Sequence, residues 1–493
     1  MSGRTRTLVF LVSTPLVVIV AVGGLLGAVS PAAQQAMPHL AVFNDVVRLI
    51  QSAYVEPPNM SHVMDGAMRG LVDGLDPDTS YLTPDDVRTV ETQSALPDGD
   101  VGLVIARQSY LRIVGVRDGS PAQRAGLQSG DFIRAIDDTP TRDMSSVTGA
   151  RLLRGAPGSK VTLLIIRNGD VADPRPVEVV REAPKTDRAS GKRLPGGEAY
   201  VRVASFGPGA AAAIKSSIAE TGAAANAGVI VDLRDVADGA NEEGIAAARL
   251  FVKSGTLAIR AGRPVRSAGQ PQAAASDAAD AAGQDDSASN AAPARGRAQR
   301  PIPIPANAVR TDAAAGDGAL TMPVVLLVSN GTAHAAEIFA SALLGNQRAR
   351  LVGEPTAGLA GVQRLVRLPD GYALLMTTER YLQNDGNPIQ GRGLRPTVFV
   401  EGPRVGFEET PPATDPILER GIRELKSPTP AAAKTADETA SETTRPAARP
   451  NPTPLPPPDA PIPPREVDPS TLPKRPPVDP STLPKTPAQP DRR

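Results

Sequence analysis

One segment of the chain, residues 329–363, constrains the fold most, because a tight turn and a helix in it directly follow a predicted strand. Five consecutive aliphatic residues, 324–328, predict a buried strand that leads into it. Asn330-Gly331 is a typical turn dipeptide, and the sequence AAEIFASALL at 335–344 predicts a helix. The first amides of a helix have no partners within it, so at such a turn they can stabilise a developing oxyanion. The segment is therefore typical of a support for a catalytic nucleophile.

A second turn, GEPTAG at 353–358, follows the helix. The two segments together resemble the carboxyl-terminal processing (tail-specific) proteases, which are serine peptidases with a Ser/Lys dyad. The first family motif is similar to G-S-A-S-A-S-E-I, in which the nucleophile lies three residues before the glutamate. The second is similar to G-E-P-T-F-G-K-G-T-V-Q, in which the lysine base lies 25 residues after the serine and a glutamine follows four residues later.

Glu337 fixes the register of this resemblance. It places His334 at the nucleophile position and Leu359 at the base position, while Gln363 matches the family's glutamine. A serine hydroxyl needs a base to accept its proton, and a leucine side chain has no proton chemistry. We therefore predict that the frame of the catalytic site is present and that no catalytic residue is intact.

Other hydroxyls lie close enough to the turn to be considered as nucleophiles. Thr332 and Ser329 flank the turn, and His334 is the nearest candidate base. No lysine occurs between 253 and 426, so a replacement amine would have to come from a distant part of the chain. An active enzyme would therefore need a non-standard nucleophile and base.

The oxyanion region shows a third departure from the family pattern. The sequence GVIVDLR at 228–234 predicts a buried strand and resembles the family's hydrophobic-D-L-R strand. In the family this strand leads into N-x-P-G-G, whose glycine amides contribute to the oxyanion hole. Here the proline is absent, Asp238 replaces one glycine, and Gly239 remains. A carboxylate at this place opposes a developing oxyanion electrostatically.

A PDZ domain is indicated over residues 97–182. The resemblance rests on GSPAQRAGLQSGDFIRAIDDTPTRDM and on the strand predicted at 161–167. It implies a carboxylate-binding loop upstream, whose amides bind the C-terminal carboxylate of a peptide while the tail adds as a strand. The predicted substrate-binding residues of this loop are Val101, Gly102, Leu103 and Val104.

The N-terminus predicts a membrane anchor or an export signal. Arg4 and Arg6 precede an apolar run of 22 residues, 8–29, which is long enough to span a bilayer. A cleaved signal peptide is the alternative, although Pro31 is a poor context for cleavage after residue 30. Both interpretations place the remaining chain outside the cytoplasm, on the periplasmic side.

The sequence predicts an α+β fold with an N-terminal helical region, a β-sandwich-like PDZ domain with two helices, and a ClpP/crotonase-like α/β core. An insertion at 266–318, rich in Ala, Ser, Asp, Gln and Gly, is expected to be disordered, as is the Pro-rich tail with its repeated VDPSTLPK. The predicted boundaries are 1–36 for the anchor or signal segment, 37–96 for the helical region, 97–182 for the PDZ domain, 183–425 for the tail-specific protease-like core and 427–493 for the tail.

Composition excludes several other classes of function. The formal net charge is zero, which argues against a nucleic-acid partner. The chain has no cysteine and only three histidines, without metal-binding spacing, so neither a metal nor a cofactor is expected.

We therefore expect a protein whose PDZ domain binds the C-terminal tails of proteins and whose core has lost hydrolysis, so that it acts as a scaffold or regulator. The alternative is an active serine-type endopeptidase with a non-standard nucleophile and base. A third possibility is an adaptor in which the Pro-rich tail and the PDZ loop both tether partners.

Overall fold

The computed structural model describes residues 31–427, apart from 93–96, 143, 168–173, 185–186, 225–226, 263–302, 404, 408 and 411. The apolar run predicted to anchor or export the protein and nearly all of the predicted tail lie outside these residues. Within the described part of the chain, no helix combines the length and hydropathy that crossing a membrane requires.

The N-terminal region is helical and is bounded by side-chain caps. Asn59 accepts a hydrogen bond from the His62 amide, and Thr83 forms a capping box with Asp86. One short strand of this region, β1 (Ser80–Leu82), pairs with a strand of the core. The helices are α2 (Pro31–Ala53), α3 (Met60–Asp73) and α4 (Pro84–Glu91).

The PDZ domain contains one antiparallel sheet with the strand order β2-β3-β4-β6-β7, and β5 pairs with β4. Its aliphatic core includes Leu111, Ile113 and Ile133, all fully buried. The strands are β2 (Leu103–Gln108), β3 (Tyr110–Val116), β4 (Phe132–Ile136), β5 (Thr139–Pro140), β6 (Lys160–Ile166) and β7 (Arg175–Val180). The helices are α5 (Pro121–Arg124) and α6 (Ser146–Leu153).

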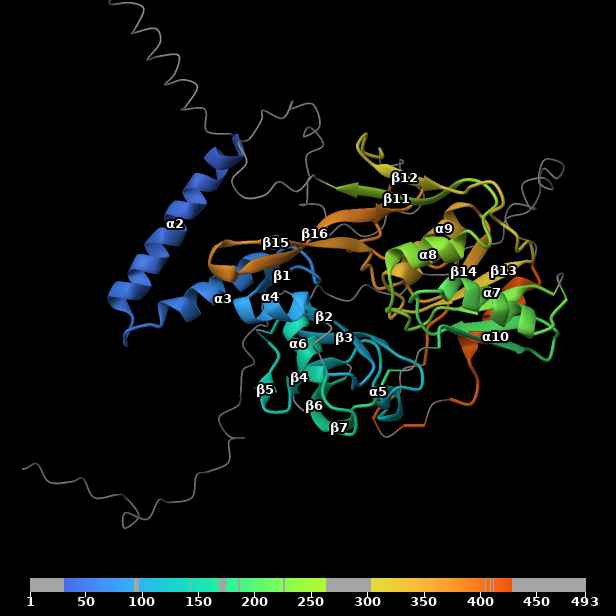
Figure 1. Cartoon of the computed structure of the whole chain (residues 1–493), viewed down its shortest axis with the longest axis horizontal. Coiled ribbons are helices and arrows are strands. Elements are labelled where there is room, and N and C mark those ends of the chain that lie inside the picture. Colours follow the sequence, from blue (N-terminus) through green and yellow to red (C-terminus); the bar gives the residue numbers. More distant parts are fainter. Residues whose placement is uncertain are drawn as a thin grey trace, which may run out of the picture. The chain divides into compact units, whose positions relative to one another are not determined.

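The protease-like core is built on a six-stranded sheet with the order β17-β14-β13-β10-β9-β8, parallel except for the β8–β9 pair (Figure 1). The strands are β8 (Ala189–Arg193), β9 (Ala199–Val203), β10 (Val229–Asp232), β13 (Val324–Val328), β14 (Ala349–Gly353) and β17 (Val398–Phe399). The helices are α7 (Ala210–Glu220), α8 (Asn241–Ala248), α9 (Ala335–Gly345) and α10 (Pro416–Leu425).

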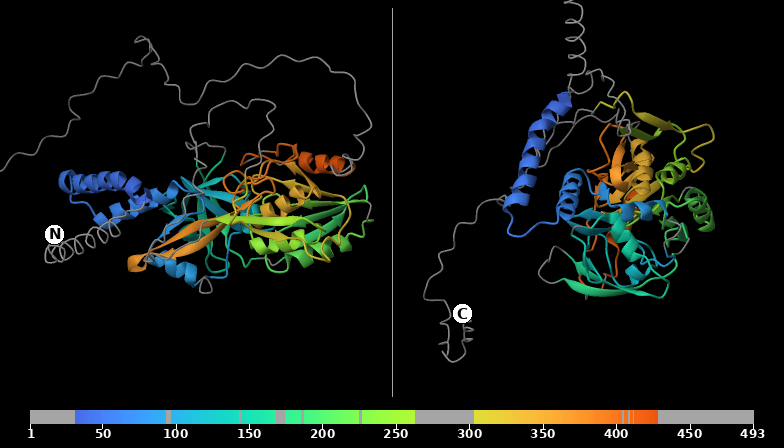
Figure 2. Two further views of the ribbon diagram at one scale, coloured as in Figure 1. Left: turned by 90° about the horizontal axis from the view of Figure 1, so that it is seen from above. Right: turned by 60° about the vertical axis from the view of Figure 1, so that its left-hand side comes forward.

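Alternating residues of the central strands pack on opposite faces of this sheet. Val229 and Leu326 belong to the cluster that includes α7, α8 and α9, whereas Ile230 and Leu327 pack against α10. Figure 2 shows α10 on one side of the sheet and the green helices on the other. Burial on both faces explains why these strands read as continuous aliphatic runs.

A second sheet of the core has the order β1-β16-β11-β12, with β15 also paired to β16. Its remaining strands are β11 (Thr256–Gly262), β12 (Val309–Asp312), β15 (Gly361–Arg367) and β16 (Ala373–Leu382), and a 3-10 turn, Pro369–Gly371, connects β15 to β16. The mixed α+β class predicted from the sequence is confirmed.

The predicted disordered insertion at 266–318 requires a correction at its C-terminal end. Residues 303–318 are part of the described structure, and β12 pairs antiparallel with β11. Composition predicted no strand here because the segment is polar. This polar segment forms a strand because the edge of β11 would otherwise be unpaired, and the backbone N–H and C=O groups of β11 need hydrogen-bond partners. Residues 266–302 lie outside the description.

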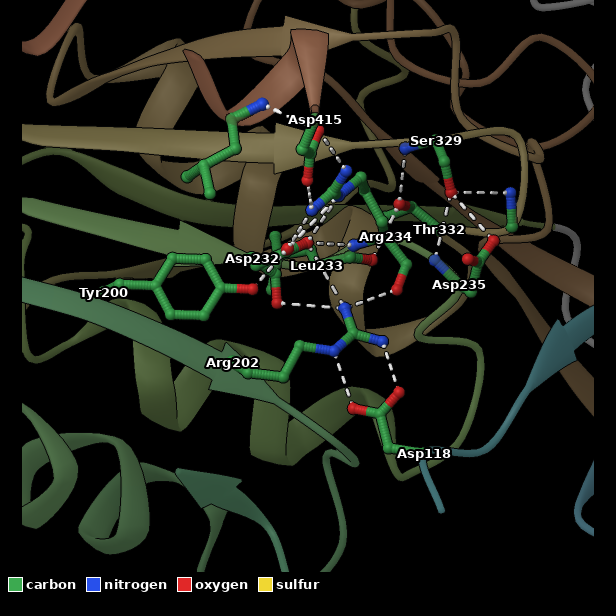
Figure 3. A network of polar contacts seen from close by, with 12 residues as sticks. Asp118, Tyr200, Arg202, Asp232, Leu233, Arg234, Asp235, Ser329, Thr332 and Asp415 are labelled. Carbon is green, nitrogen blue, oxygen red and sulfur yellow. Dashed lines mark hydrogen bonds and ion pairs between the residues drawn. The ribbon is translucent and has the colours of Figure 1, made fainter. Parts of the chain in front are cut away.

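Charged side chains at the carboxyl ends of β9 and β10 connect the core to the PDZ domain (Figure 3). Arg202 Nε lies 2.6 Å from Asp118 Oδ2, on the PDZ side, and Arg202 Nη1 lies 3.3 Å from Asp232 Oδ1. Arg234 binds both Asp232 and Asp415, at 2.6 and 2.8 Å. Burial by itself raises the pKa of Asp232, but the two guanidinium groups outweigh it and hold that pKa below its usual value.

Replacing Arg202 with methionine is expected to lower the free energy of unfolding by about 3 kcal/mol, because two largely buried carboxylates, Asp118 and Asp232, lose this cation. Urea denaturation followed by circular dichroism measures the change. Arg193→Met, at an exposed position on β8, is the control and should change stability by less than about 0.5 kcal/mol. Superimposable curves for the two variants would contradict a structural role of the Arg202 pairs.

Candidate active site

A strained turn joins β13 to α9 and carries His334. This residue is the N-cap of α9, with φ 52° and ψ −121°, a conformation that residues with a side chain rarely adopt. Such a conformation costs on the order of 1–3 kcal/mol and is found mainly at functional sites. The sequence-predicted nucleophile position therefore has the backbone geometry of a nucleophile elbow, although it holds an imidazole.

Glu337 connects the start of α9 to the second turn. Its buried carboxylate accepts hydrogen bonds from the Thr356 hydroxyl and from the amides of Gly358 and Leu359, the last two at 2.7 and 2.8 Å. Burial raises the pKa of Glu337 to about 7, although these hydrogen bonds favour the charged form. The same carboxylate thus brings Leu359 into the site that begins at His334.

Leu359 packs in a small apolar cluster that spans the core and the PDZ domain. It is only 6% exposed and clusters with Ala237 and Ala333 of the core and with Ala106 and Val114 of the PDZ sheet. The Leu359 side chain therefore lies among aliphatic carbons of both domains. The leucine at the predicted base position is therefore a contact between the two domains.

Two glycines allow this close approach of the domains. A Cβ atom at Gly115 of β3 would lie 2.8 Å from the carbonyl oxygen of Asp235, and one at Gly331 would lie 2.8 Å from the carbonyl oxygen of Val114. Any side chain at either position would push the PDZ sheet away from the turn.

The oxyanion region keeps its backbone constraint but has a different charge environment from the one expected. Gly239 has φ 122°, and a Cβ atom there would lie 2.3 Å from the Phe206 carbonyl oxygen, so a glycine is required. The sequence predicts that the carboxylate of Asp238 opposes a developing oxyanion. Its carboxylate instead lies 3.3 Å from Arg117 Nε of the PDZ domain. The carboxylate is therefore partly neutralised by a residue that the local sequence pattern could not identify.

The two hydroxyls predicted as spare nucleophiles are both used to hold the turn (Figure 3). The fully buried Thr332 hydroxyl donates to the Leu233 carbonyl oxygen at 2.8 Å and accepts from the Ser329 amide at 3.0 Å. The Ser329 hydroxyl donates to Asp235 Oδ1 at 3.1 Å and accepts from the amides of Asp235 and Gly331. Neither hydroxyl donates to His334, so neither is activated by the candidate base.

Asp78 is a residue of this site that the sequence interpretation missed. Gln363 donates to its carbonyl oxygen at 2.5 Å, and Gln390 donates to its Oδ2 atom at 3.4 Å. Burial raises the pKa of Asp78, and His334 lies close enough to oppose this shift electrostatically. The sequence feature that could have identified Asp78 is GLDPDTSYL, residues 74–82. It resembles the family element G-L-D-P-H-S-x-Y-L, but an aspartate stands where that element has a histidine.

The predicted carboxylate-binding loop of the PDZ domain is partly occupied by the chain itself. The Gly102 amide donates to Asp100 Oδ1 at 3.0 Å, and Val101 is fully buried. Gly102 has φ 84°, and a Cβ atom there would lie 2.2 Å from the Ser120 Cβ atom. Leu103 and Val104 begin β2, which pairs only with β3 and so keeps one edge open to an added strand.

A metal centre is not formed by the part of the chain that the structure describes, where no three His, Cys, Asp or Glu side chains gather as ligands.

The buried carboxyl of Glu337 predicts a pH dependence of stability. Between about pH 4.5 and 7 the native state holds a proton that the unfolded chain has released, so this contribution is fully present below about pH 4.5 and is lost as the pH rises through 7. The free energy of unfolding of the wild type should fall by about 3 kcal/mol across this range, relative to that of Glu337→Gln, whose side chain cannot titrate. Urea titrations at several pH values measure the difference, and parallel profiles would contradict the raised pKa.

The strained turn predicts an unusual effect of glycine. His334→Gly is expected to be about 1 kcal/mol more stable than His334→Ala, because glycine adopts positive φ freely and alanine retains the strain. Thermal unfolding of both variants under the same conditions is the measurement. An alanine variant at least as stable as the glycine variant would show that position 334 is not strained.

Comparison with known proteins agrees with this architecture. Residues 198–400 match peptidase family S41, and residues 112–167 match the PDZ domain. The chain is 27% identical to a carboxy-terminal-processing protease of Bartonella bacilliformis, over 75% of this chain and 77% of the relative. It is 28% identical to a carboxyl-terminal-processing protease of Synechocystis, over 74% and 78% of the two chains.

One solved structure extends the likeness to the fold. The photosystem II D1 C-terminal processing protease superposes with a TM-score of 0.55 at 24% identity, covering 77% of this chain and 90% of that protein. The likeness to a solved structure and the matches to both domains agree with the sequence relatives. The chain therefore belongs to the carboxyl-terminal processing protease family, serine-type peptidases of family S41 that carry a PDZ domain.

Proposed function

We propose that this protein has lost peptide hydrolysis, binds the C-terminal tails of proteins through its PDZ domain, and acts as a scaffold or regulator. The observation that carries the proposal is the packing of Leu359. A side chain without proton chemistry fills the position that the resemblance assigns to the lysine base, and it is buried against the PDZ sheet.

The lack of a free hydroxyl and of an amine base near the described turn supports the same proposal. A Ser/Lys mechanism needs a hydroxyl that is free to attack and an amine that accepts its proton. The hydroxyls of Thr332 and Ser329 instead donate to Leu233 and Asp235, and no lysine occurs between 253 and 426. Freeing either hydroxyl would break the hydrogen bonds that shape the turn.

The open edge of β2 supports the tail-binding part of the proposal. A peptide that pairs with this edge would satisfy backbone groups that β2 does not use with β3. Near the end of the strand the Arg107 amide already donates to the Pro77 carbonyl oxygen at 3.2 Å, so the free edge is short. We expect only the last few residues of a tail to be bound as a strand.

We also propose an extracytoplasmic location, with the apolar run at 8–29 acting as an anchor or an export signal. Tails of proteins on the periplasmic side are then the partners to which the PDZ domain has access.

A second candidate is an active endopeptidase that uses His334 in a non-standard way. Asp78 favours it, because a carboxylate near an imidazole can support its role as a base. The candidate lacks a nucleophile among the described side chains of the site, since both hydroxyls near the turn are committed elsewhere. We therefore favour the inactive interpretation.

Full-length protein is expected to leave an unfolded, tail-bearing substrate uncleaved, and a serine-reactive phosphonate should not label it, because the hydroxyls of Ser329 and Thr332 in the described site are committed to other acceptors. Mass spectrometry of the substrate and of the protein is the measurement, with an active Ser/Lys relative as the positive control. Cleavage that disappears in His334→Ala would establish the second candidate and reject the first.

A further inference from the structure

A large polar cavity lies between the PDZ domain and the core, at the carboxyl ends of the parallel strands. Its volume is about 840 Å³, and its walls include Arg112 and Phe132 of the PDZ sheet and Asp235, Asn330 and Glu354 of the core. Of the residues that the sequence analysis singled out as catalytic or substrate-binding candidates, Ser329 lines it, whereas His334, Leu359 and the predicted carboxylate-binding loop do not. Carboxyl ends of parallel strands are a common place for ligands in α/β folds.

Three arginines of the cavity wall are already paired with carboxylates. Arg167 lies 2.7 Å from Asp131, in an ion pair that is nearly inaccessible to solvent. Arg202 and Arg234 take part in the network of Figure 3, with Asp118, Asp232 and Asp415 as partners. These cations therefore have structural partners and little capacity left for a ligand.

Arg112 differs from these three arginines. It lies on β3, where Leu111 and Ile113 point into the PDZ core, so Arg112 and Val114 lie on the face turned toward the protease-like core. No ion pair or hydrogen bond joins the Arg112 side chain to any residue of the described part of the chain. Burial lowers the pKa of Arg112. A half-buried, uncompensated cation is unfavourable for folding, so it is a candidate for a ligand contact.

The opposite wall of the cavity supplies hydrogen-bond acceptors. Asp235 accepts from the hydroxyls of Ser129 and Ser329, and Glu354 accepts from the Gly402 amide at 3.0 Å, which leaves lone pairs on both carboxylates. A ligand that presents one carboxylate toward Arg112 and N–H donors toward Asp235 and Glu354 would match both walls. A peptide segment with a carboxylate has this combination of groups.

We propose that this cavity binds a carboxylate of a peptide, with Arg112 as the residue that receives it. The inference rests on the proposed function in tail binding and deepens it. The Gly102 amide of the predicted carboxylate loop is occupied by Asp100, so the chain offers its free cation in the interdomain cavity instead. The carboxylate comes from the peptide's C-terminus or from an acidic side chain, because the two share the same chemistry toward a guanidinium.

Fluorescence anisotropy of the full-length protein with three fluorescein-labelled peptides of one alanine- and leucine-containing sequence tests the proposal. The first peptide has a free C-terminal carboxylate, the second is C-terminally amidated, and the third is amidated with one internal glutamate. Arg112→Gln is expected to weaken binding of the carboxylate-bearing peptides about tenfold and to leave binding of the neutral peptide unchanged. Arg134→Gln, at an exposed position on β4 away from the cavity, is the matched control.

The first and third peptides distinguish the source of the carboxylate, because loss of affinity for only one of them identifies the terminal or the side-chain group. Equal affinities of wild type and Arg112→Gln for every peptide that the wild type binds would overturn this inference and leave tail binding intact. If the wild type binds none of the peptides, the proposed tail binding fails as well. Raised affinity for the free-acid peptide in Asp100→Asn, without an effect of Arg112→Gln, would place the carboxylate in the loop and also overturn the inference.

A second readout separates ligand binding from folding. Arg112→Met should not lower the melting temperature of the free protein, because it removes an uncompensated charge from a half-buried position. Adding the free-acid peptide should raise the melting temperature of the wild type and not that of Arg112→Met. A methionine variant that is destabilised without peptide would assign Arg112 a structural role and contradict the proposal.

Discussion

The buried carboxyl of Glu337 is the interaction on which the geometry of the candidate site depends. It receives the amides of Gly358 and Leu359 and the hydroxyl of Thr356, so the N-terminus of α9 and the second turn are held together by one side chain. The Thr356 hydroxyl in turn accepts from the Leu394 amide. Removing these partners would leave several buried polar groups unsatisfied, so this carboxyl holds the frame of the candidate site in place.

The two positions that the resemblance assigns to the dyad have been filled in different ways. Position 334 keeps the strained backbone, which glycine alone would adopt without cost, and holds an imidazole near Asp78. Position 359 has become part of an apolar contact with Ala106 and Val114 of the PDZ sheet. Position 334 therefore holds a polar side chain in the candidate site, and position 359 joins the two domains through an apolar contact. The contact with the PDZ domain depends on Gly115 and Gly331, which leave room for it.

Ion pairs between the PDZ domain and the core distinguish the arginines that hold the fold together from an arginine that is available to a ligand. Arg117 binds Asp100 and lies beside Asp238, and Arg202 joins Asp118 to Asp232, so these cations link the PDZ domain to the core. Arg112 faces the same interface without such a partner among the described residues. Arg117 and Arg202 each have two acidic neighbours and serve the fold. A half-buried arginine without an acidic partner, such as Arg112, is better explained by contact with a ligand.

The sequence by itself determined the family, the α+β class and the PDZ domain, because these depend on ordered motifs and on local hydrophobic patterns. The register that assigns His334 and Leu359 to the dyad positions stays a prediction. It also placed the strands of the core, whose aliphatic runs reflect burial on both faces. It missed β12, which forms only because β11 offers a free edge. Only the tertiary structure decided that Thr332 and Ser329 are committed to the turn, that Asp238 faces Arg117, and that Arg112 has no acidic partner in the described chain. Each of these depends on residues far apart in sequence, and no local pattern encodes which distant side chain will satisfy a buried polar group.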